Sequence, residues 1–122
     1  MAKKILVVDD EKALVETIRI RLEANGYEVD AGYDGMEAIE KARKNNPDLI
    51  ILDLMLPKLN GYQVCRMLKF DEDYKNIPII ILTGRDGEVD REMGGKVGAE
   101  AYITKPFDAP VLLAKIKELL KT

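Results

Sequence analysis

Short apolar runs alternate with amphipathic stretches along the whole chain, and this alternation constrains the fold more than any other feature. The amphipathic stretches place apolar residues three and four positions apart, as on one face of an α-helix. Repeated strand–helix units of this length predict a parallel sheet with helices on both faces. The expected strands span residues 5–8, 27–31, 49–54, 79–82 and 101–104, and the expected helices begin near residues 13, 34, 60, 89 and 108.

Five strand–helix units favour one topology. Right-handed crossovers leave few arrangements of a parallel sheet, and the doubly wound, flavodoxin-like α/β order 2-1-3-4-5 is the natural choice for five strands. Asp34 and Asp108 precede helical stretches and are predicted to cap them. Gly94 and Gly95 each cost about 1 kcal/mol relative to alanine, so the expected helix at 89–97 is the weakest.

The composition indicates a single globular domain over residues 1–122. Apolar residues make up 47% of the chain, and the net charge of -3 comes with no basic block, so disorder and nucleic-acid binding lack support. The apolar runs are too short to span a membrane. One cysteine, Cys65, and no signal-peptide pattern fit a cytoplasmic protein. The absence of histidine excludes Ser-His and Cys-His nucleophile pairs and His-ligated zinc.

Acidic residues stand at the ends of two strands that the topology makes neighbours. Asp9 and Asp10 follow the first strand, and Asp53 lies at the end of the third. Ligands of doubly wound sheets bind at this edge, where the winding reverses. Carboxylates this close repel one another, and a divalent cation removes the conflict. Because Mg²⁺ prefers oxygen ligands, the three aspartates predict a magnesium site.

Two further strand ends add complementary chemistry at the same edge. Thr83 follows the fourth strand with a hydroxyl, and Lys105 follows the fifth with a mobile positive charge. Taken singly, the aspartate pair suits a helix cap, and Thr83 and Lys105 suit ordinary loop positions. Together they predict a site for a phosphoryl group, in which Asp53 acts as the nucleophile and forms an acyl phosphate.

Five motifs together resemble the receiver domain of response regulators in bacterial two-component signalling systems, including chemotaxis-regulator-like receivers. The motifs are V-V-D-D-E at 7–11, L-D-L-M-L-P at 52–57, N-G at 60–61, I-L-T-G at 81–84 and Y-I-T-K-P-F at 102–107. Each motif is modest alone, but their order and spacing within one short α/β domain make the joint resemblance specific.

The resemblance implies a role for each matching residue. Asp53 would accept the phosphoryl group, and Asp10 would bind Mg²⁺ directly with help from Asp9. The backbone carbonyl of Met55 would complete the protein ligands of the metal. Thr83 would hydrogen-bond to the phosphoryl oxygens, and Lys105 would pair with them after a cis peptide bond to the following proline.

The resemblance also implies a switch and its partners. Thr83 would move toward the phosphoryl group, and Tyr102 would rotate from exposed to buried, which changes the face formed by the helix at 89–97, the strand at 101–104 and the last helix. The donor would be a sensor histidine kinase or a histidine phosphotransfer protein. The receiver would be a signalling switch that catalyses its own phosphorylation and dephosphorylation. A downstream effector, an attached output domain or a phosphorylation-dependent homodimer would read the switched face.

The chain departs from the family pattern at a few positions. Many relatives have Ala-Asp-Asp-Tyr where this chain has Ala-Glu-Ala-Tyr at 99–102, and many have an apolar residue at the position of Gly95. Met55 and Arg85 stand where family members tune the hydrolysis of the acyl phosphate. The sequence leaves open whether the receiver acts alone or within a longer regulator.

Three alternatives share parts of this pattern. A flavodoxin-like electron carrier has the same fold class, but Asp9 and Asp10 would repel its cofactor phosphate. A phosphatase of the haloacid dehalogenase type usually has a second acidic residue where this chain has Met55. A pseudo-receiver that only binds partners would not need the complete set of aspartates, Thr83 and Lys105.

Overall fold

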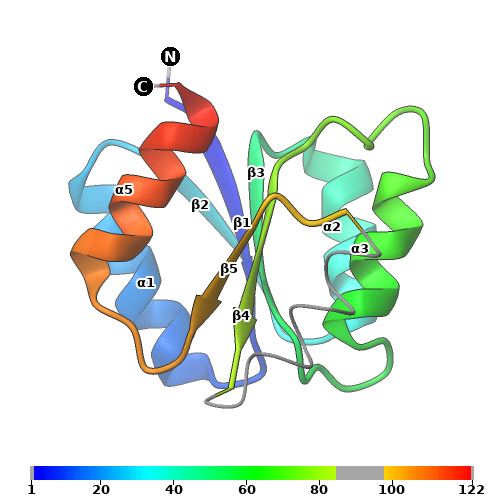
Figure 1. Cartoon of the computed structure of the whole chain (residues 1–122), viewed down its shortest axis with the longest axis horizontal. Coiled ribbons are helices and arrows are strands. Elements are labelled where there is room, and N and C mark those ends of the chain that lie inside the picture. Colours follow the sequence, from blue (N-terminus) through cyan, green and yellow to red (C-terminus); the bar gives the residue numbers. More distant parts are fainter. Residues whose placement is uncertain (1, 85–97, 122) are drawn as a thin grey trace.

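The computed structural model describes residues 2–84 and 98–121, which form a five-stranded parallel sheet with helices on both faces (Figure 1). The strand order β2-β1-β3-β4-β5 confirms the predicted topology. The strands are β1 (Lys4–Val8), β2 (Glu28–Gly32), β3 (Leu49–Asp53), β4 (Ile79–Thr83) and β5 (Ala101–Thr104). The helices are α1 (Lys12–Ala24), α2 (Gly35–Asn45), α3 (Gly61–Lys69) and α5 (Ala109–Leu120). The predicted helix at 89–97 lies outside the described residues.

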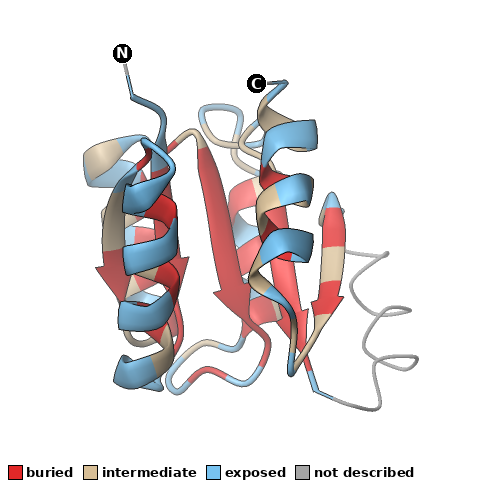
Figure 2. Ribbon diagram, turned by 90° about the vertical axis from the view of Figure 1, so that its left-hand side faces the viewer, coloured by how far each residue is buried: buried red, intermediate tan, exposed pale blue. Residues whose placement is uncertain are grey.

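Two hydrophobic layers hold the helices on the sheet. Helices α1 and α5 cover one face, and α2 and α3 cover the other (Figure 1). Alternate residues of β1 point to opposite layers, because side chains of a strand alternate between its faces. The central strands β3 and β4 are buried at every position, whereas the edge strands β2 and β5 mix buried and partly exposed residues (Figure 2). The predicted strand order put the run at 27–31 at an edge of the sheet, and β2 lies there.

The helix starts agree with the sequence in part. Asp34 caps α2, since its side chain accepts a hydrogen bond of 2.8 Å from the backbone N–H of Glu37. Asn60 forms a capping box with Gln63 at the start of α3. Asp108 occupies the N-cap position of α5, but its side chain makes no capping hydrogen bond, so that part of the prediction was wrong.

A partly buried ionic contact joins α3 to the starts of β4 and β5. The Lys69 ammonium donates to the Ile77 carbonyl at 2.9 Å and to Glu100 Oε2 at 2.7 Å. The other oxygen of Glu100 accepts from the Ile79 backbone N–H at 2.8 Å. The glutamate that departs from the family pattern is therefore a structural link at the end of the sheet opposite the acidic residues.

The parallel strands deliver their carboxyl ends to one edge of the sheet, at the bottom of Figure 1. Asp53 and Thr83 are the last residues of β3 and β4, and Asp9 and Lys105 directly follow β1 and β5. Among residues 2–84 and 98–121, no helix combines the length and the apolar character needed to cross a membrane.

Candidate functional site

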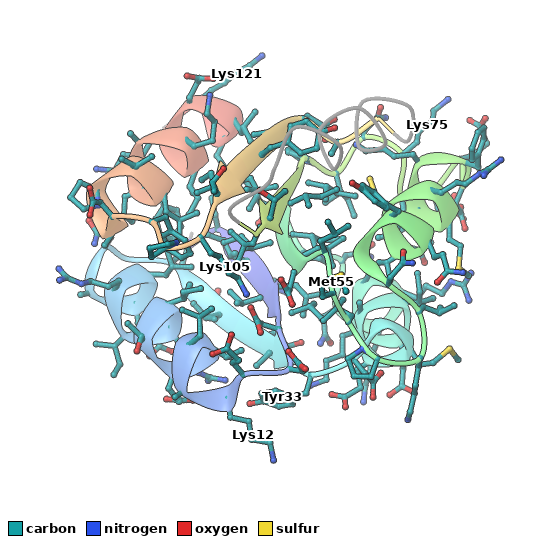
Figure 3. All side chains as sticks on the ribbon, turned by 60° about the horizontal axis from the view of Figure 1, so that its bottom comes forward. Lys12, Tyr33, Met55, Lys75, Lys105 and Lys121 are labelled. Atoms are coloured by element: carbon teal, nitrogen blue, oxygen red, sulfur yellow. The ribbon has the colours of Figure 1, made fainter. Side chains whose placement is uncertain are left out.

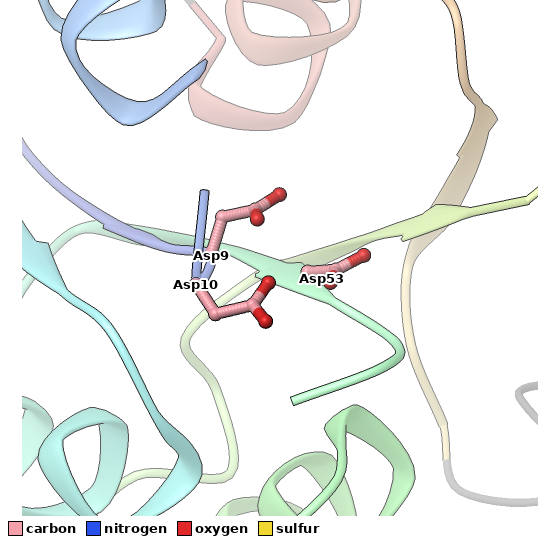
Figure 4. A group of neighbouring side chains, drawn as sticks. All are labelled: Asp9, Asp10 and Asp53. Carbon is pink, nitrogen blue, oxygen red and sulfur yellow. The ribbon is translucent and has the colours of Figure 1, made fainter. Parts of the chain in front are cut away.

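The three predicted aspartates converge at the switch point between β1 and β3. Carboxylate oxygens of Asp9, Asp10 and Asp53 all lie within 4.8 Å of one another (Figure 4). Asp9 is fully buried and Asp53 is 6% exposed, whereas Asp10 faces solvent. The sheet register produces this arrangement, because Val8 pairs with Leu52 and so brings the following residues of the two strands together.

Lys105 reaches the same site from the loop after β5. Its ammonium lies 2.8 Å from Asp9 Oδ2 and 3.1 Å from Asp53 Oδ1, and 3.8 Å from the exposed carboxylate of Glu11. Its backbone N–H donates to the Thr83 carbonyl at 2.7 Å, and the peptide bond to the next proline is cis, as the resemblance implied. Lys105 therefore bridges the two most buried carboxylates of the site.

Backbone contacts fix the positions of the acidic residues. Asp9 Oδ1 accepts a hydrogen bond of 2.9 Å from the Glu11 backbone N–H, and the Asp9 backbone N–H donates to the Gly32 carbonyl at 3.2 Å. At β3, a Cβ atom on Gly61 would lie 2.6 Å from the Asp53 carbonyl oxygen, so only glycine allows α3 to start against the end of this strand. The close approach holds the Asp53 backbone in place.

The charges at the site are out of balance. Burial, followed by the negative charge of Asp9, raises the pKa of Asp53, although Lys105 acts in the opposite direction. Burial alone would lower the pKa of Lys105, but its hydrogen bonds to Asp9 and Asp53 outweigh burial and raise that pKa. Among the described residues, the carboxylates of Asp9, Asp10 and Asp53 share the ammonium of Lys105, so negative charge is in excess at the site. The site therefore favours the uptake of further positive charge.

Two hydroxyl groups near β4 and β5 are buried without a hydrogen-bond partner among the described residues. Thr83 Oγ1 belongs to a fully buried side chain at the end of β4. The phenol oxygen of Tyr102 is also buried, while the rest of its side chain is partly exposed. A buried hydroxyl without a partner costs about 1–3 kcal/mol, so the Thr83 hydroxyl suits a ligand oxygen.

Met55 lies in the loop after β3, and its side chain is 76% exposed. Figure 3 turns the strand-end edge toward the viewer and shows both Met55 and Lys105 on it. The role of the Met55 carbonyl as a metal ligand stays a prediction. The sequence did not reveal that Asp9 pairs with Lys105, because their contact spans 96 positions of the chain.

Comparison with known proteins decides the family. The family model described as "Response regulator receiver domain" matches residues 5–117. The chain belongs to the response regulator receiver domain family. As a receiver domain, it stands apart from the flavodoxin-like carriers and dehalogenase-type phosphatases that share parts of its sequence pattern.

Individual relatives support this assignment. The receiver domain is 46% identical to the alkaline phosphatase synthesis transcriptional regulatory protein PhoP of Bacillus subtilis, over 99% of this chain and 50% of PhoP. It thus spans about half the length of this curated relative. A response regulator structure from Chloroflexus aurantiacus has a TM-score of 0.95 and 32% identity, with both chains covered completely.

A second solved structure bears on the acidic site. The receiver domain of the sensor histidine kinase PA1611 from Pseudomonas aeruginosa PAO1 has a TM-score of 0.91 and 30% identity, with complete coverage of both chains. That structure has a magnesium ion coordinated in its active site cleft.

Proposed function

We propose that this receiver domain accepts a phosphoryl group on Asp53 in a reaction that depends on Mg²⁺. The single observation that carries the proposal is the Lys105 ammonium between Asp9 and Asp53, beside a third carboxylate. A purely structural ion pair has no need of two further negative charges. A site that binds a divalent cation and a phosphoryl group uses all of them.

The donor set fits Mg²⁺. Three carboxylates within 4.8 Å supply hard oxygen ligands, and the exposure of Asp10 leaves room for the waters that Mg²⁺ usually keeps. Asp9, Asp10, Asp53 and the Met55 carbonyl would hold the ion. When bound, the ion supplies positive charge that stabilises the transferring phosphoryl group.

Asp53, Lys105 and Thr83 then have different roles in the phosphoryl transfer. A carboxylate oxygen of Asp53 forms the new bond to phosphorus, while the bond between phosphorus and the donor's imidazole nitrogen breaks and the nitrogen keeps the electron pair. Lys105 exchanges its contact with Asp53 for one with a phosphoryl oxygen. The unpartnered Thr83 hydroxyl donates a hydrogen bond to another phosphoryl oxygen. In dephosphorylation, water attacks the phosphorus, the bond between phosphorus and the Asp53 oxygen breaks, and inorganic phosphate leaves while the Asp53 carboxylate keeps the electron pair. Because the same site residues stabilise this step, the receiver would catalyse its own dephosphorylation.

The new hydrogen bond of Thr83 would change the protein surface through its neighbouring strand β5. Thr83 pairs with Thr104 in the sheet, and Tyr102 lies two residues before Thr104. The buried, unpartnered phenol oxygen of Tyr102 is a second group whose environment can change with phosphorylation. The face around β5 and α5 is therefore the proposed output surface, and its reader would be an effector, an attached output domain or a second receiver.

The partners follow from the family. A sensor histidine kinase or a histidine phosphotransfer protein would be the donor, and the cytoplasm would be the site of action. PhoP is named as a transcriptional regulatory protein and is about twice as long as this chain. A transcriptional output is accordingly a proposal for a longer regulator, because this domain has a net charge of -3 and no basic block for direct DNA binding.

Intact mass measured after incubation with acetyl phosphate and Mg²⁺ tests the proposal. The wild-type domain should gain one phosphoryl group, and Asp53→Asn should gain none. Asp73→Asn is the matched control, since it makes the same change at an exposed aspartate outside the site, and it should react like the wild type. Chelation of the metal should abolish the gain in the wild type and in Asp73→Asn. No gain by the wild type would support the pseudo-receiver alternative.

A further inference from the structure

A groove lies directly beside the phosphoacceptor site, between α1 and α5. It is open to solvent and has a volume of about 540 Å³. Leu14, Ile18 and Leu22 of α1 form one wall, and Leu112 of α5 contributes to the opposite wall. A cavity of this volume with apolar walls is typical of small-molecule sites.

One end of the groove belongs to the site itself. Gly84, Lys105 and Pro106 line the groove, and the Lys105 ammonium contacts Asp53 at 3.1 Å. A molecule whose reactive end lies at Asp53 can therefore place an attached apolar body against Leu14 and beyond.

The charges that line the groove favour an anion. Among the described residues that line it, Lys105 and Arg21 carry charge and none is acidic. Leu22 follows Leu14 by eight positions in α1, which corresponds to about 12 Å along the helix axis. The groove thus suits a linear apolar chain that ends in an anionic group.

We propose that the groove binds the acyl chain of apolar acyl phosphates, so that these molecules phosphorylate Asp53 more efficiently than acetyl phosphate does. The inference rests on the proposed phosphoacceptor function and adds a substrate class to the same site. A carboxylate oxygen of Asp53 forms a bond to phosphorus, and the bond between phosphorus and the acyl oxygen breaks. The leaving fatty carboxylate keeps the electron pair and dissociates from the groove.

Hexanoyl phosphate compared with acetyl phosphate isolates the contribution of the groove. Both donors carry the same reacting group, and they differ by four methylene groups. Each fully buried methylene strengthens binding by about fourfold. Because the groove is open on one side, burial equivalent to about two methylenes is expected, which gives a gain of about fifteenfold in kcat/KM. The gain should appear in KM, since the added contacts are made before and during the reaction.

The assay measures initial rates of phosphorylation by intact mass at several concentrations of each donor, with Mg²⁺ present. Ala109→Trp fills the groove at a lining position, and Ala114→Trp is the matched control at an exposed position of the same helix outside the groove. Ala109→Trp should lower the ratio of the two kcat/KM values toward one, and Ala114→Trp should keep the wild-type ratio. Because each variant is its own reference, a general loss of folding lowers both rates and not their ratio.

A measurement on the wild type alone gives a second test. Free hexanoate should inhibit phosphorylation by acetyl phosphate at concentrations where free acetate has no effect. Equal kcat/KM values for the two donors, or a preference that Ala109→Trp leaves intact, would overturn the inference. If neither donor phosphorylates Asp53, the proposed function itself fails.

Discussion

Replacing Asp53 with asparagine should make the receiver domain more stable when no metal is present. Asp53 is 6% exposed, and its carboxylate lies within 4.8 Å of those of Asp9 and Asp10. Its favourable charged contact is Lys105 at 3.1 Å. Asparagine keeps the shape of the side chain and removes its charge, so the substitution tests whether the site is held under electrostatic repulsion.

Coulomb's law gives the size of the effect. At an effective dielectric constant of about 20, each repulsion at the 4.8 Å limit amounts to about 3.5 kcal/mol, and the attraction to Lys105 amounts to about 5.4 kcal/mol. The two repulsions exceed the attraction by about 1.5 kcal/mol. The burial of an ionised carboxylate adds to this difference. Asp53→Asn should therefore raise the free energy of unfolding by about 1–2 kcal/mol, or the Tm by about 5 °C.

Urea unfolding followed by circular dichroism, in a chelator at pH 7, measures this difference. Asp73→Asn serves as the exposed control and should leave the stability unchanged. The pKa of Asp53 is raised in the folded state, so its proton stabilises the fold at low pH and this contribution is lost as the pH rises through that pKa. The advantage of Asp53→Asn should accordingly shrink as the pH falls through the raised pKa. Saturating Mg²⁺ should also shrink it, because the ion stabilises the wild type.

A wild-type domain at least as stable as Asp53→Asn in chelator at pH 7 would refute this reasoning. The ammonium of Lys105 would then be sufficient to balance the site, and the electrostatic argument for a divalent cation would lose its support. The fit of the three carboxylates to Mg²⁺ would rest on their geometry alone.

Three further predictions concern the scaffold. Gly61→Ala should lower the free energy of unfolding by about 1–3 kcal/mol and slow phosphorylation, since its Cβ would meet the last carbonyl of β3. The Cβ of Gly84→Ala meets open space, so this variant should keep the free energy of unfolding, measured in urea, within about 0.5 kcal/mol of the wild type. Lys69→Met and Glu100→Gln should each lower the free energy of unfolding by about 2 kcal/mol, because each breaks the ionic contact between the two side chains. The double variant should lower it by clearly less than the sum of the two, and strict additivity would contradict this coupling. Burial raises the pKa of Cys65 from 9.0 to about 11, so the folded protein at pH 8 should resist thiol reagents. The free energy of unfolding should fall as the pH rises from 9.0 to about 11. Rapid labelling of Cys65 without unfolding would contradict this prediction.

Most of the fold could be predicted from the sequence because each strand and helix carries a local signal. The apolar runs predicted all five strands, and each predicted end lies within one residue of the observed end. For example, β3 ends at Asp53 rather than at residue 54. Asp34 caps α2 as predicted, because capping depends on the neighbouring three residues. Asp108 fails as a side-chain cap although it stands at the correct position.

Long-range contacts explain what the sequence did not reveal. Lys69 and Glu100 are 31 positions apart, and nothing local marks either residue as the partner of the other. The groove between α1 and α5 depends on how two helices lie on one face of the sheet, and each helix alone shows only an ordinary apolar stripe.

The sequence by itself determined which residues stand at the ends of the strands, because each strand stops where its apolar run stops. From these strand ends and the rules of parallel sheets, the sequence placed Asp9, Asp53, Thr83 and Lys105 at one edge of the sheet. Only the tertiary structure decided how these groups interact: that Lys105 bridges Asp9 and Asp53, and that Thr83 keeps a buried hydroxyl without a partner among the described residues. These features depend on distances of a few ångströms between distant parts of the chain, and such distances are fixed by packing.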